Sequence, residues 1–363
     1  MNWSAADHSH MYRAIQLARR GLNSTHPNPR VGCVMVRDGR IIGEGWHAYA
    51  GGPHAEVNAI SNAIEDVHGA DCYVTLEPCS HTGKTPPCTD ALIAARIARL
   101  VAAMQDPNPA VDGTGLEQLK QAGIRVETGL LENHARELNP GYIKRRREQR
   151  PFIRCKLAMS LDARTALASG ESRWISGEAA RLDVQRLRAQ SSAIMTGIGT
   201  VLADDPQLSV RDLDAGGRQP LRVIIDPQLK IPVSARILNQ DGRTLVFTRS
   251  ANEDICSDLR KSGAEIVSLN EDGFLDKAVR YLAMEEEINE ILLECGSNLA
   301  GGMLKMDLID EIIIYLAPLL MGDDARGLFH LPDILTMGNT VKLELIETRQ
   351  VGKDIRLKLK VKS

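Results

Sequence analysis

The sequence predicts a mixed α/β protein of two domains, each built from strands that alternate with helices. Apolar runs with strand character recur along the chain, and segments with helical spacing separate them. The length of 363 residues exceeds one typical domain and fits two. A basic, polar stretch at residues 141–151 ends in proline, and we interpret it as a solvated helix end and linker. We therefore expect domains over residues 1–149 and 150–363.

The bulk composition is that of an ordinary globular protein. Hydrophobic residues make up 43% and charged residues 25% of the chain. The formal charge of -3 does not indicate binding to nucleic acid or to an anionic membrane. The chain contains no apolar run near the roughly 18 residues that span a bilayer, and residues 1–16 do not form a secretory signal. We expect a cytoplasmic protein, whose seven cysteines serve as ligands or core residues rather than disulfides.

In the first domain, strand and helix patterns follow one another closely. Apolar residues at helical spacing predict a helix over 7–22, and residues 31–47 predict a hairpin that turns at Asp38-Gly39. Further along we expect helices over 54–64 and 86–97 and strands over 72–78 and 99–104. Residues 115–129 then predict a helix that ends at a glycine and is followed by a strand. This order predicts an α/β sandwich around a largely parallel sheet.

The second domain repeats this alternation without an internal sequence repeat. Strand-like runs separated by helical segments lie at 152–160, 192–200, 221–227, 243–250, 264–270, 287–296 and 310–318. They predict a second α/β unit.

The most informative residues are His54 and Glu56, with Cys79 and Cys88 further on. Zinc takes nitrogen and sulfur ligands in a tetrahedral set, and a catalytic site leaves the fourth position to water. One histidine and two cysteines supply three ligands, and Glu56, two residues beyond His54, is placed to move a proton. A His-x-Glu pattern followed by Pro-Cys and a second cysteine is typical of zinc deaminases.

The placement of these residues favours a catalytic site. His54 and Cys88 each open a predicted helix, and a helix N-terminus favours the thiolate that binds metal. Eight residues separate the two cysteines, so we expect residues 80–87 to loop out beside the metal and contact the substrate. A structural zinc site, with His81 as the fourth ligand, and two core cysteines near an unrelated histidine are the alternatives.

Longer motifs add a resemblance that covers nearly the whole chain. The segments THPNPRVGCV, HAEVNAI, YVTLEPCSHTGKTPPCTDALI and MQDPNPAVDGTG resemble the deaminase half of the bifunctional riboflavin-biosynthesis deaminase–reductases. The segments KLAMSLDARTALASGESRWIS, RAQSSAIMTGIGTVLADDPQLSVR, ECGSNLAGGML and YLAPLLMGDDARGL resemble the reductase half, which is similar to dihydrofolate reductase. The resemblance implies a cytidine-deaminase-like three-layer α/β/α domain followed by a dihydrofolate-reductase-like α/β domain.

The resemblance also implies two consecutive reactions and their cofactors. The first is zinc-dependent hydrolytic deamination of 2,5-diamino-6-(5-phosphoribosylamino)pyrimidin-4-one, and the second is NADPH-dependent reduction of the ribosyl side chain to ribityl. A homodimer through the reductase domain is implied as well. In the deaminase half, the resemblance implies that zinc is bound by His54, Cys79 and Cys88 and that Glu56 is the proton shuttle. The implied contacts to the pyrimidine are Asn28, His47, Lys84 and Asp106.

For the reductase half, the resemblance implies two groups of residues. The contacts to NADPH are Ala158, Trp174, Thr200 and Asp204, together with Gly296, Ser297, Asn298, Leu299, Ala300, Gly301 and Gly302. The contacts to substrate are Ser172, Arg188, Leu208, Arg211 and Glu294.

The residues themselves support the reductase less strongly. The chain has no G-x-G-x-x-G fingerprint, although the glycine-rich turn at 296–302 follows a strand and could bring backbone amides to a diphosphate. Arg188 and Arg211 suit a substrate phosphate, because guanidinium forks onto phosphate oxygens. Thr248-Arg249-Ser250 has the groups to hold the 2′-phosphate of NADPH. A plain turn and surface charges remain alternatives for the glycines and arginines.

Two other functions remain open on the sequence. A tRNA or nucleobase deaminase would share the metal ligands, but the balanced charge and the four Phe and three Trp argue against a stacking, basic surface. A non-catalytic zinc-stabilised scaffold would need a closed site with four protein ligands and would leave Glu56 unexplained.

Overall fold

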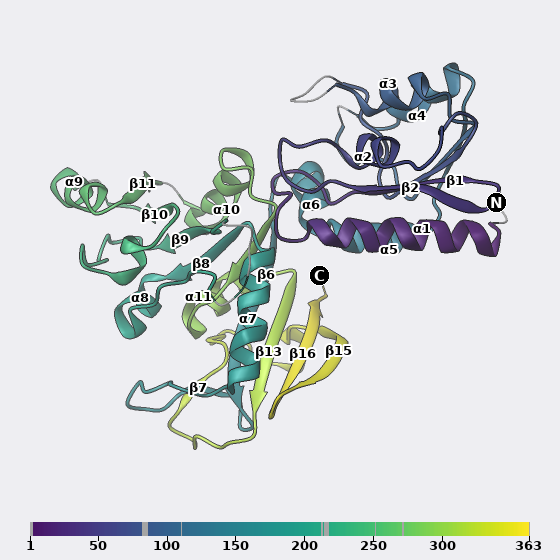
Figure 1. The fold of residues 1–363 in the computed structure, drawn as a ribbon. Helices are drawn as coiled ribbons and strands as arrows, with labels where there is room; N and C mark the ends of the chain where they lie inside the picture. Colours follow the sequence, from purple (N-terminus) through teal and green to yellow (C-terminus); the bar gives the residue numbers. More distant parts are fainter. Residues whose placement is uncertain are drawn as a thin grey trace. The chain divides into compact units, whose positions relative to one another are not determined.

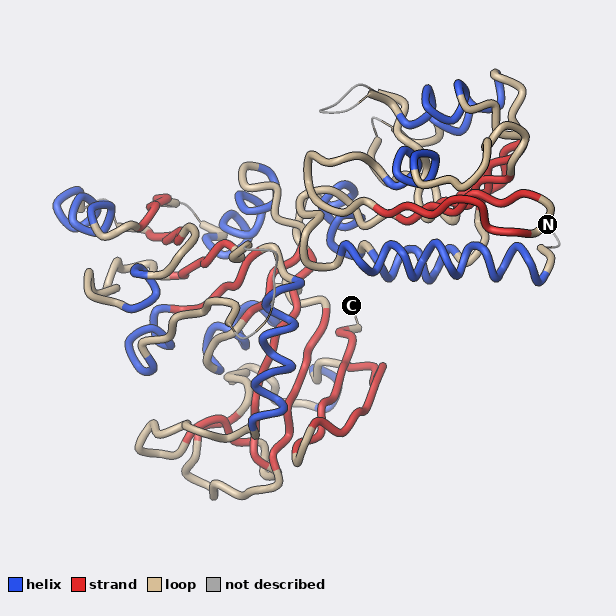
Figure 2. The backbone as a smooth tube through the Cα atoms, viewed as in Figure 1, coloured by secondary structure: helices blue, strands red, loops and turns tan. Residues whose placement is uncertain are grey.

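The computed structural model describes residues 3–81, 86–109, 111–211, 213, 218–250, 252–270 and 272–362. It divides the chain into two compact units, residues 1–149 and 150–363. Figure 1 and Figure 2 show both units as mixed α/β structures. Among the described residues, no helix has the length and apolar character needed to cross a membrane.

Unit 1 is a three-layer sandwich. Its elements are α1 (Ala5–Ala18), the 3-10 helix η1 (Arg19–Gly21), β1 (Gly32–Arg37), β2 (Arg40–Trp46), α2 (Ala55–Ser61), β3 (Asp71–Val74), α3 (Cys88–Ala94), β4 (Arg99–Ala102), α4 (Thr114–Gln121), β5 (Arg125–Thr128), α5 (Glu132–Leu138) and α6 (Pro140–Glu148). The sheet order is β2-β1-β3-β4-β5, with β1 antiparallel to β2 and β3, and β3, β4 and β5 parallel. The expected hairpin turns at Asp38 and Gly39, both at positive φ.

Alternation along the strands of unit 1 gives the sheet two apolar faces. On β1, Val34 and Val36 pack with α1 and α5, whereas Cys33 and Met35 pack with α2, α3 and α4. Figure 1 shows α1 and α5 on one side of this sheet and α2, α3 and α4 on the other. Two of the metal-ligand candidates, His54 and Cys88, lie at the starts of α2 and α3 in the second of these helix layers.

The basic stretch after residue 140 differs from the expected linker. It forms α6, whose Tyr142 is buried and packs in the core cluster on the α1 face. The one large aromatic ring of the stretch therefore holds the helix against unit 1, although its charged residues are typical of solvated chain.

Unit 2 is built on a nine-stranded sheet. Its elements are β6 (Phe152–Ser160), β7 (Arg164–Ala166), α7 (Glu178–Gln190), β8 (Ala193–Gly197), α8 (Ile198–Asp204), β9 (Leu221–Ile225), η2 (Arg236–Asn239), β10 (Thr244–Thr248), α9 (Glu253–Lys261), β11 (Ala264–Ser268), α10 (Phe274–Met284), β12 (Glu290–Leu293), α11 (Ser297–Lys305), β13 (Glu311–Ala317), β14 (Arg326–Gly327), η3 (Met337–Asn339), β15 (Leu343–Val351) and β16 (Asp354–Val361). The sheet order is β11-β10-β9-β8-β12-β6-β13-β16-β15.

The central strands of unit 2 are parallel and buried on both faces. All pairs from β11 through β13 are parallel, and the hairpin β15–β16 adds two antiparallel strands at one edge. One core cluster joins β6, β12, α10 and α11, and a second joins α7, α9 and the opposite face of the sheet. Ligands of such sheets bind at the carboxyl ends of the strands, which here lead into α8 and α11.

Candidate active sites

Helix α2 holds His54 and Glu56 close to the sheet of unit 1. His54 is the N-cap residue of α2, and its side chain makes no capping hydrogen bond to the helix. Glycine at position 45 of β2 allows the close approach, because a Cβ there would lie 2.2 Å from the backbone oxygen of Ala55. The side chain of Glu56, in the first turn, is driven inward and is only 3% exposed.

The two cysteines meet the histidine at the start of α3. Cys88 is the first residue of α3, and its backbone N–H donates to Sγ of Cys79 at 3.4 Å. The Nδ1 atom of His54 lies 3.2 Å from Sγ of Cys88 and 3.5 Å from Sγ of Cys79. One ligand atom from each of the three residues lies within 4.8 Å of the others.

This donor set fits zinc. Tetrahedral bonds of about 2.1 Å to nitrogen and 2.3 Å to sulfur place the two donor atoms about 3.6 Å apart, within a few tenths of an ångström of the 3.2 and 3.5 Å between His54 and the two cysteines. Among the described residues, no fourth His, Cys, Asp or Glu joins the group, and His81 is exposed outside it. The described part of the chain therefore favours a three-ligand site over the four-ligand alternatives.

Burial and mutual contact shift the acidities at this cluster. Burial raises the pKa of Glu56 to about 7, although the nearby His54 opposes the shift. The hydrogen bond from Cys88 lowers the pKa of Cys79, and the same contact raises the pKa of the Cys88 thiol. A bound cation favours the thiolate form of both cysteines, because metal binding releases ligand protons.

Asn28 and His47 lie next to the cluster. Nδ1 of His47 is 3.1 Å from the backbone oxygen of Pro53, so this nitrogen carries the proton. Its Nε2 then accepts a hydrogen bond from Nδ2 of Asn28 at 3.0 Å. The ring of His47 packs edge-on against that of His54, with centroids 5.2 Å apart.

The other two expected pyrimidine contacts are Asp106 and Lys84. Asp106 is buried, and its carboxylate accepts hydrogen bonds from the hydroxyl of Tyr142 (3.1 and 3.2 Å) and from the backbone N–H of Asn108 (2.8 Å). Tyr142 was not expected near the site, and the sequence signal for it, an aromatic residue in a basic stretch, is weak. Lys84 lies outside the described residues.

In unit 2, two helices begin side by side at the carboxyl ends of adjacent strands. The parallel strands β8 and β12 lead directly into α8 and α11, whose N-cap residues are Gly197 and Gly296. A Cβ on Gly296 would lie 4.0 Å from Oγ1 of Thr200, and one on Gly197 would lie 3.1 Å from Cδ2 of Leu299. The residues expected to contact NADPH on α8 and α11 are thus brought together, and their free backbone N–H groups suit a diphosphate.

The other residues expected to contact NADPH border this region. Asp204 ends α8 and pairs with the guanidinium of Arg173 at 3.8 Å. Trp174, the neighbour of Arg173, is 70% exposed and carries the guanidinium of Arg181 over its ring at 4.7 Å. Ala158 is half-buried on β6.

The expected substrate contacts include a buried ion pair. Nε and Nη2 of Arg188 donate to the carboxylate of Glu294 at 2.6 and 3.1 Å, and Nη1 donates to the backbone oxygen of Ser209 at 3.1 Å. Lys156 on β6, which the sequence reasoning missed, lies 3.8 Å from the same carboxylate. Burial raises the pKa of Glu294, but the charges of Arg188 and Lys156 outweigh it and hold the value at about 2.

Leu208, Ser172 and Arg211 complete the expected substrate contacts. Leu208 is buried, whereas Ser172 is half-buried. The backbone N–H of Arg211 donates to Oε1 of Gln185 at 3.0 Å, and its guanidinium donates to Gln207. The charge of Arg211 also contributes to the low pKa of Glu294, so it faces the same cluster.

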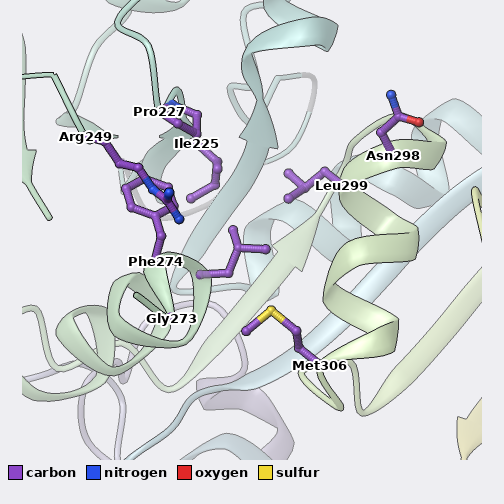
Figure 3. Close-up of a pocket in the computed structure, with 9 residues that line it drawn as sticks. Ile225, Pro227, Arg249, Gly273, Phe274, Asn298, Leu299 and Met306 are labelled. Carbon is purple, nitrogen blue, oxygen red and sulfur yellow. The ribbon is translucent and has the colours of Figure 1, made fainter. Parts of the chain in front are cut away.

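A pocket of about 490 Å³ opens between β9, β10, α10 and α11. Figure 3 shows Arg249 lying over the ring of Phe274 on one side, and Leu299 and Asn298 of α11 on the other. The guanidinium of Arg249 is 5.1 Å from the ring centroid and, within the described part of the chain, has no carboxylate partner. Ile225, Leu275 and Met306 add apolar walls.

Family models match both units. The model described as the cytidine and deoxycytidylate deaminase zinc-binding region matches residues 4–104, and the model of the RibD C-terminal domain matches residues 151–357.

Relatives and solved structures match nearly the full length. The riboflavin biosynthesis protein RibD of Escherichia coli is 49% identical over 97% of this chain and 99% of its own, and that of Haemophilus influenzae is 44% identical over 98% of each. The structure of Acinetobacter baumannii RibD, form 1, superposes with a TM-score of 0.92, 44% identity and 99% coverage of each chain. A Thermotoga maritima diaminohydroxyphosphoribosylaminopyrimidine deaminase/5-amino-6-(5-phosphoribosylamino)uracil reductase gives 0.87, 35% identity, and coverage of 98% of this chain and 99% of its own.

Proposed function

The chain belongs to the RibD family of bifunctional riboflavin-biosynthesis enzymes, and from that premise we propose which of its residues carry the two reactions. It hydrolytically deaminates 2,5-diamino-6-(5-phosphoribosylamino)pyrimidin-4-one with zinc and then reduces the ribosyl side chain to ribityl with NADPH. One observation supports the residue assignments most: an imidazole and two thiols converge within 4.8 Å, beside a buried carboxyl. The full-length similarity decides against the nucleobase-deaminase and scaffold hypotheses.

We assign the deamination to residues 1–149. Zinc held by His54, Cys79 and Cys88 would supply an activated water at neutral pH. Glu56 takes the proton from the attacking water and delivers it to the departing 2-amino group, which leaves as ammonia. Its burial in the first turn of α2 fixes the carboxyl beside the cysteine ligands and excludes bulk water from the proton path.

Four further side chains in this unit are assigned to the pyrimidine: Asn28, His47, Asp106 and Lys84. The amide nitrogen of Asn28 is engaged with Nε2 of His47, so its carbonyl oxygen is the atom we assign to a pyrimidine N–H. Asp106, oriented by Tyr142, accepts a second ring or amino N–H. The assignment of Lys84 rests on the family resemblance alone.

We assign the reduction to residues 150–363. The adjoining N-termini of α8 and α11 receive the diphosphate of NADPH, with Thr200 beside Gly296 and with Ala158, Asp204 and Trp174 bordering the nucleotide. Arg188 holds the Glu294 carboxylate through two hydrogen bonds, so Arg211 is the arginine we assign to the substrate phosphate. Ser172 and Leu208 are assigned to the substrate by resemblance.

The adenosine end of NADPH fits the pocket between β9, β10, α10 and α11. The apolar walls of Ile225, Leu275 and Leu299 suit a flat heterocycle. Arg249 stands at the rim with its guanidinium stacked on Phe274 and without a carboxylate partner among the described residues, so we assign it to the 2′-phosphate. NADH lacks that phosphate, so Arg249 would set the preference for NADPH.

A homodimer and a cytoplasmic location complete the proposal. The edge hairpin β15–β16 exposes Leu343, Leu345, Ile346 and Ile355, and an uncovered apolar edge strand is a place where a second copy can pair symmetrically. All seven cysteines are free thiols, which agrees with a reducing compartment such as the cytoplasm. Replacing Leu345, which is 58% exposed, with Lys should yield a monomer by light scattering, whereas an unchanged mass would exclude this edge as the interface.

One coupled experiment tests both halves of the proposal. Purified, zinc-replete protein is incubated with the diamino substrate, with and without NADPH, and the products are identified by mass. We expect ammonia and the deaminated product without NADPH, and a further gain of two hydrogens with it. An unchanged substrate, or reduction that precedes deamination, would contradict the proposal.

A further inference from the structure

One buried carboxylate joins the metal side of the deaminase site to its substrate side. Glu77 lies two residues before Cys79 and is 4% exposed, and its backbone N–H donates to Met104 at 3.0 Å. Its two oxygens accept hydrogen bonds from four backbone N–H groups of the segment that leads from Asp106 into α4: Asp106 (3.0 Å) and Gly113 (3.0 Å) on Oε2, and Gly115 (3.0 Å) and Leu116 (3.4 Å) on Oε1.

The carboxylate replaces a local helix cap. The N-cap residue of α4 is Gly113 at φ 89°, which has no side chain to accept from the first N–H groups of the helix. Glu77, more than 30 residues earlier in the chain, accepts from them instead, and its negative charge suits the positive end of α4. The backbones are in direct contact as well, because a Cβ on Gly115 would lie 2.2 Å from the oxygen of Pro78.

Helix α4 in turn touches both segments that carry the cysteines. The hydroxyls of Ser80 and Thr114 are 2.8 Å apart, next to Cys79. Thr89, next to Cys88, donates its hydroxyl proton to Gln118 at 2.9 Å. The position of Asp106 is thereby tied through α4 and Glu77 to the two metal-binding segments.

We propose that Glu77 is a positioning residue for deamination, which sets the distance between the metal ligands and the pyrimidine contact Asp106. The inference rests on the substrate contact assigned to Asp106 above. In this scheme Glu77 touches neither substrate nor metal. It acts by fixing the position of the Asp106 backbone N–H relative to Cys79. Loss of its carboxylate should therefore weaken substrate binding while zinc stays bound.

The test is a kinetic comparison of Glu77→Gln with Asp106→Asn and the double variant, in full-length, zinc-loaded protein. A glutamine has one acceptor oxygen, so it loses two of the four hydrogen bonds. We expect a rise in the KM for deamination of about tenfold or more, since small misplacements of binding groups are costly, with a smaller change in kcat. Zinc per chain and the NADPH-dependent reduction of separately deaminated substrate should stay unchanged.

The double variant separates positioning from a merely structural role. If Glu77 acts through Asp106, adding Glu77→Gln to Asp106→Asn raises KM no further. An unchanged KM in Glu77→Gln, or a KM in the double variant equal to the product of the single effects, would overturn the inference. An unchanged KM in Asp106→Asn would refute the proposed substrate contact, and this inference with it.

Two more variants complete the comparison: one is a control and the other can replace Glu77→Gln. Glu117→Gln removes an exposed carboxylate from the same helix and should match the parent protein in KM. Glu77→Asp keeps the charge but is one methylene shorter, and it carries the test if Glu77→Gln fails to fold or to hold zinc. A raised KM with zinc bound then supports the proposal, and a parental KM overturns it.

Discussion

Replacing Arg249 with Ala should lower the preference of the reductase for NADPH over NADH by about tenfold. A hydrogen bond between charged groups contributes about 1.5–3 kcal/mol. The guanidinium of Arg249 is stacked on Phe274 but exposed to solvent, so we take the lower value. At about 1.4 kcal/mol per factor of ten, kcat/KM for NADPH should fall about tenfold. The value for NADH should stay within about twofold, since NADH presents no 2′-phosphate to lose.

The assay follows cofactor oxidation with deaminated substrate held at saturation. Arg280→Ala serves as the matched control, because it removes an exposed arginine from α10 that is paired with Asp276 at 2.8 Å and lies outside the pocket. Equal losses with NADPH and NADH in Arg249→Ala would show that the variant disturbs the fold or the diphosphate site. An unchanged kcat/KM for NADPH would refute the assignment of this pocket to the 2′-phosphate.

Three further outcomes follow from the contacts. Chelation of zinc should abolish ammonia release and leave the reduction of deaminated substrate intact, and parallel loss of both activities would contradict the division between the units. Gly45→Ala should cost about 1–3 kcal/mol and weaken zinc binding, because its Cβ would lie 2.2 Å from the oxygen of Ala55, and a metal titration with parental affinity would disprove this reasoning. The pKa of Glu294 is held at about 2, below its ordinary 4.5, so the ionised group stabilises the fold above pH 4.5 and this stability is lost as the pH falls towards 2. Urea unfolding should show that Glu294→Gln removes up to about 3 kcal/mol of this pH dependence, and parallel parent and variant curves would contradict the ion pair.

Much of the fold could be predicted because its signals are local. The hairpin turn at Asp38-Gly39 and the alternating strands and helices of both units are each indicated by short stretches of sequence. The sequence also predicted that His54, Cys79 and Cys88 come together, as they do, because His54 and Cys88 each lie at the start of a helix and the His54-x-Glu56 spacing is a local signal. The three-layer and reductase folds agree with the family resemblance.

The hairpin β15–β16 was missed although its sequence carries a signal. Polar and apolar residues alternate on both sides of Gly352, which adopts φ 62° in the turn. The many charged residues conceal this alternation, because the hairpin lies at the edge of the sheet and buries little of either face.

Contacts between distant residues could not be predicted from local patterns. Glu294 lies 106 residues from Arg188, and Glu77 lies 29 to 39 residues from the N–H groups that it binds. Nothing near either carboxylate in the sequence indicates its partner, because the parallel strands that bring them together are joined by long crossovers. Arg188 is an example: its guanidinium donates to Glu294 and to the backbone oxygen of Ser209, which no local pattern indicated, and its contact with a substrate phosphate stays a prediction.

The most direct test of the zinc deaminase assignment is a paired measurement on Glu56→Gln, of metal content and of ammonia release. The variant keeps His54, Cys79 and Cys88, so we expect one zinc per chain as in the parent. We expect ammonia release to fall by about a thousandfold, within the 10²–10⁴ range of acid–base catalysis, while NADPH oxidation with deaminated substrate continues. A zinc-loaded Glu56→Gln protein that releases ammonia at the parental rate would contradict the assignment.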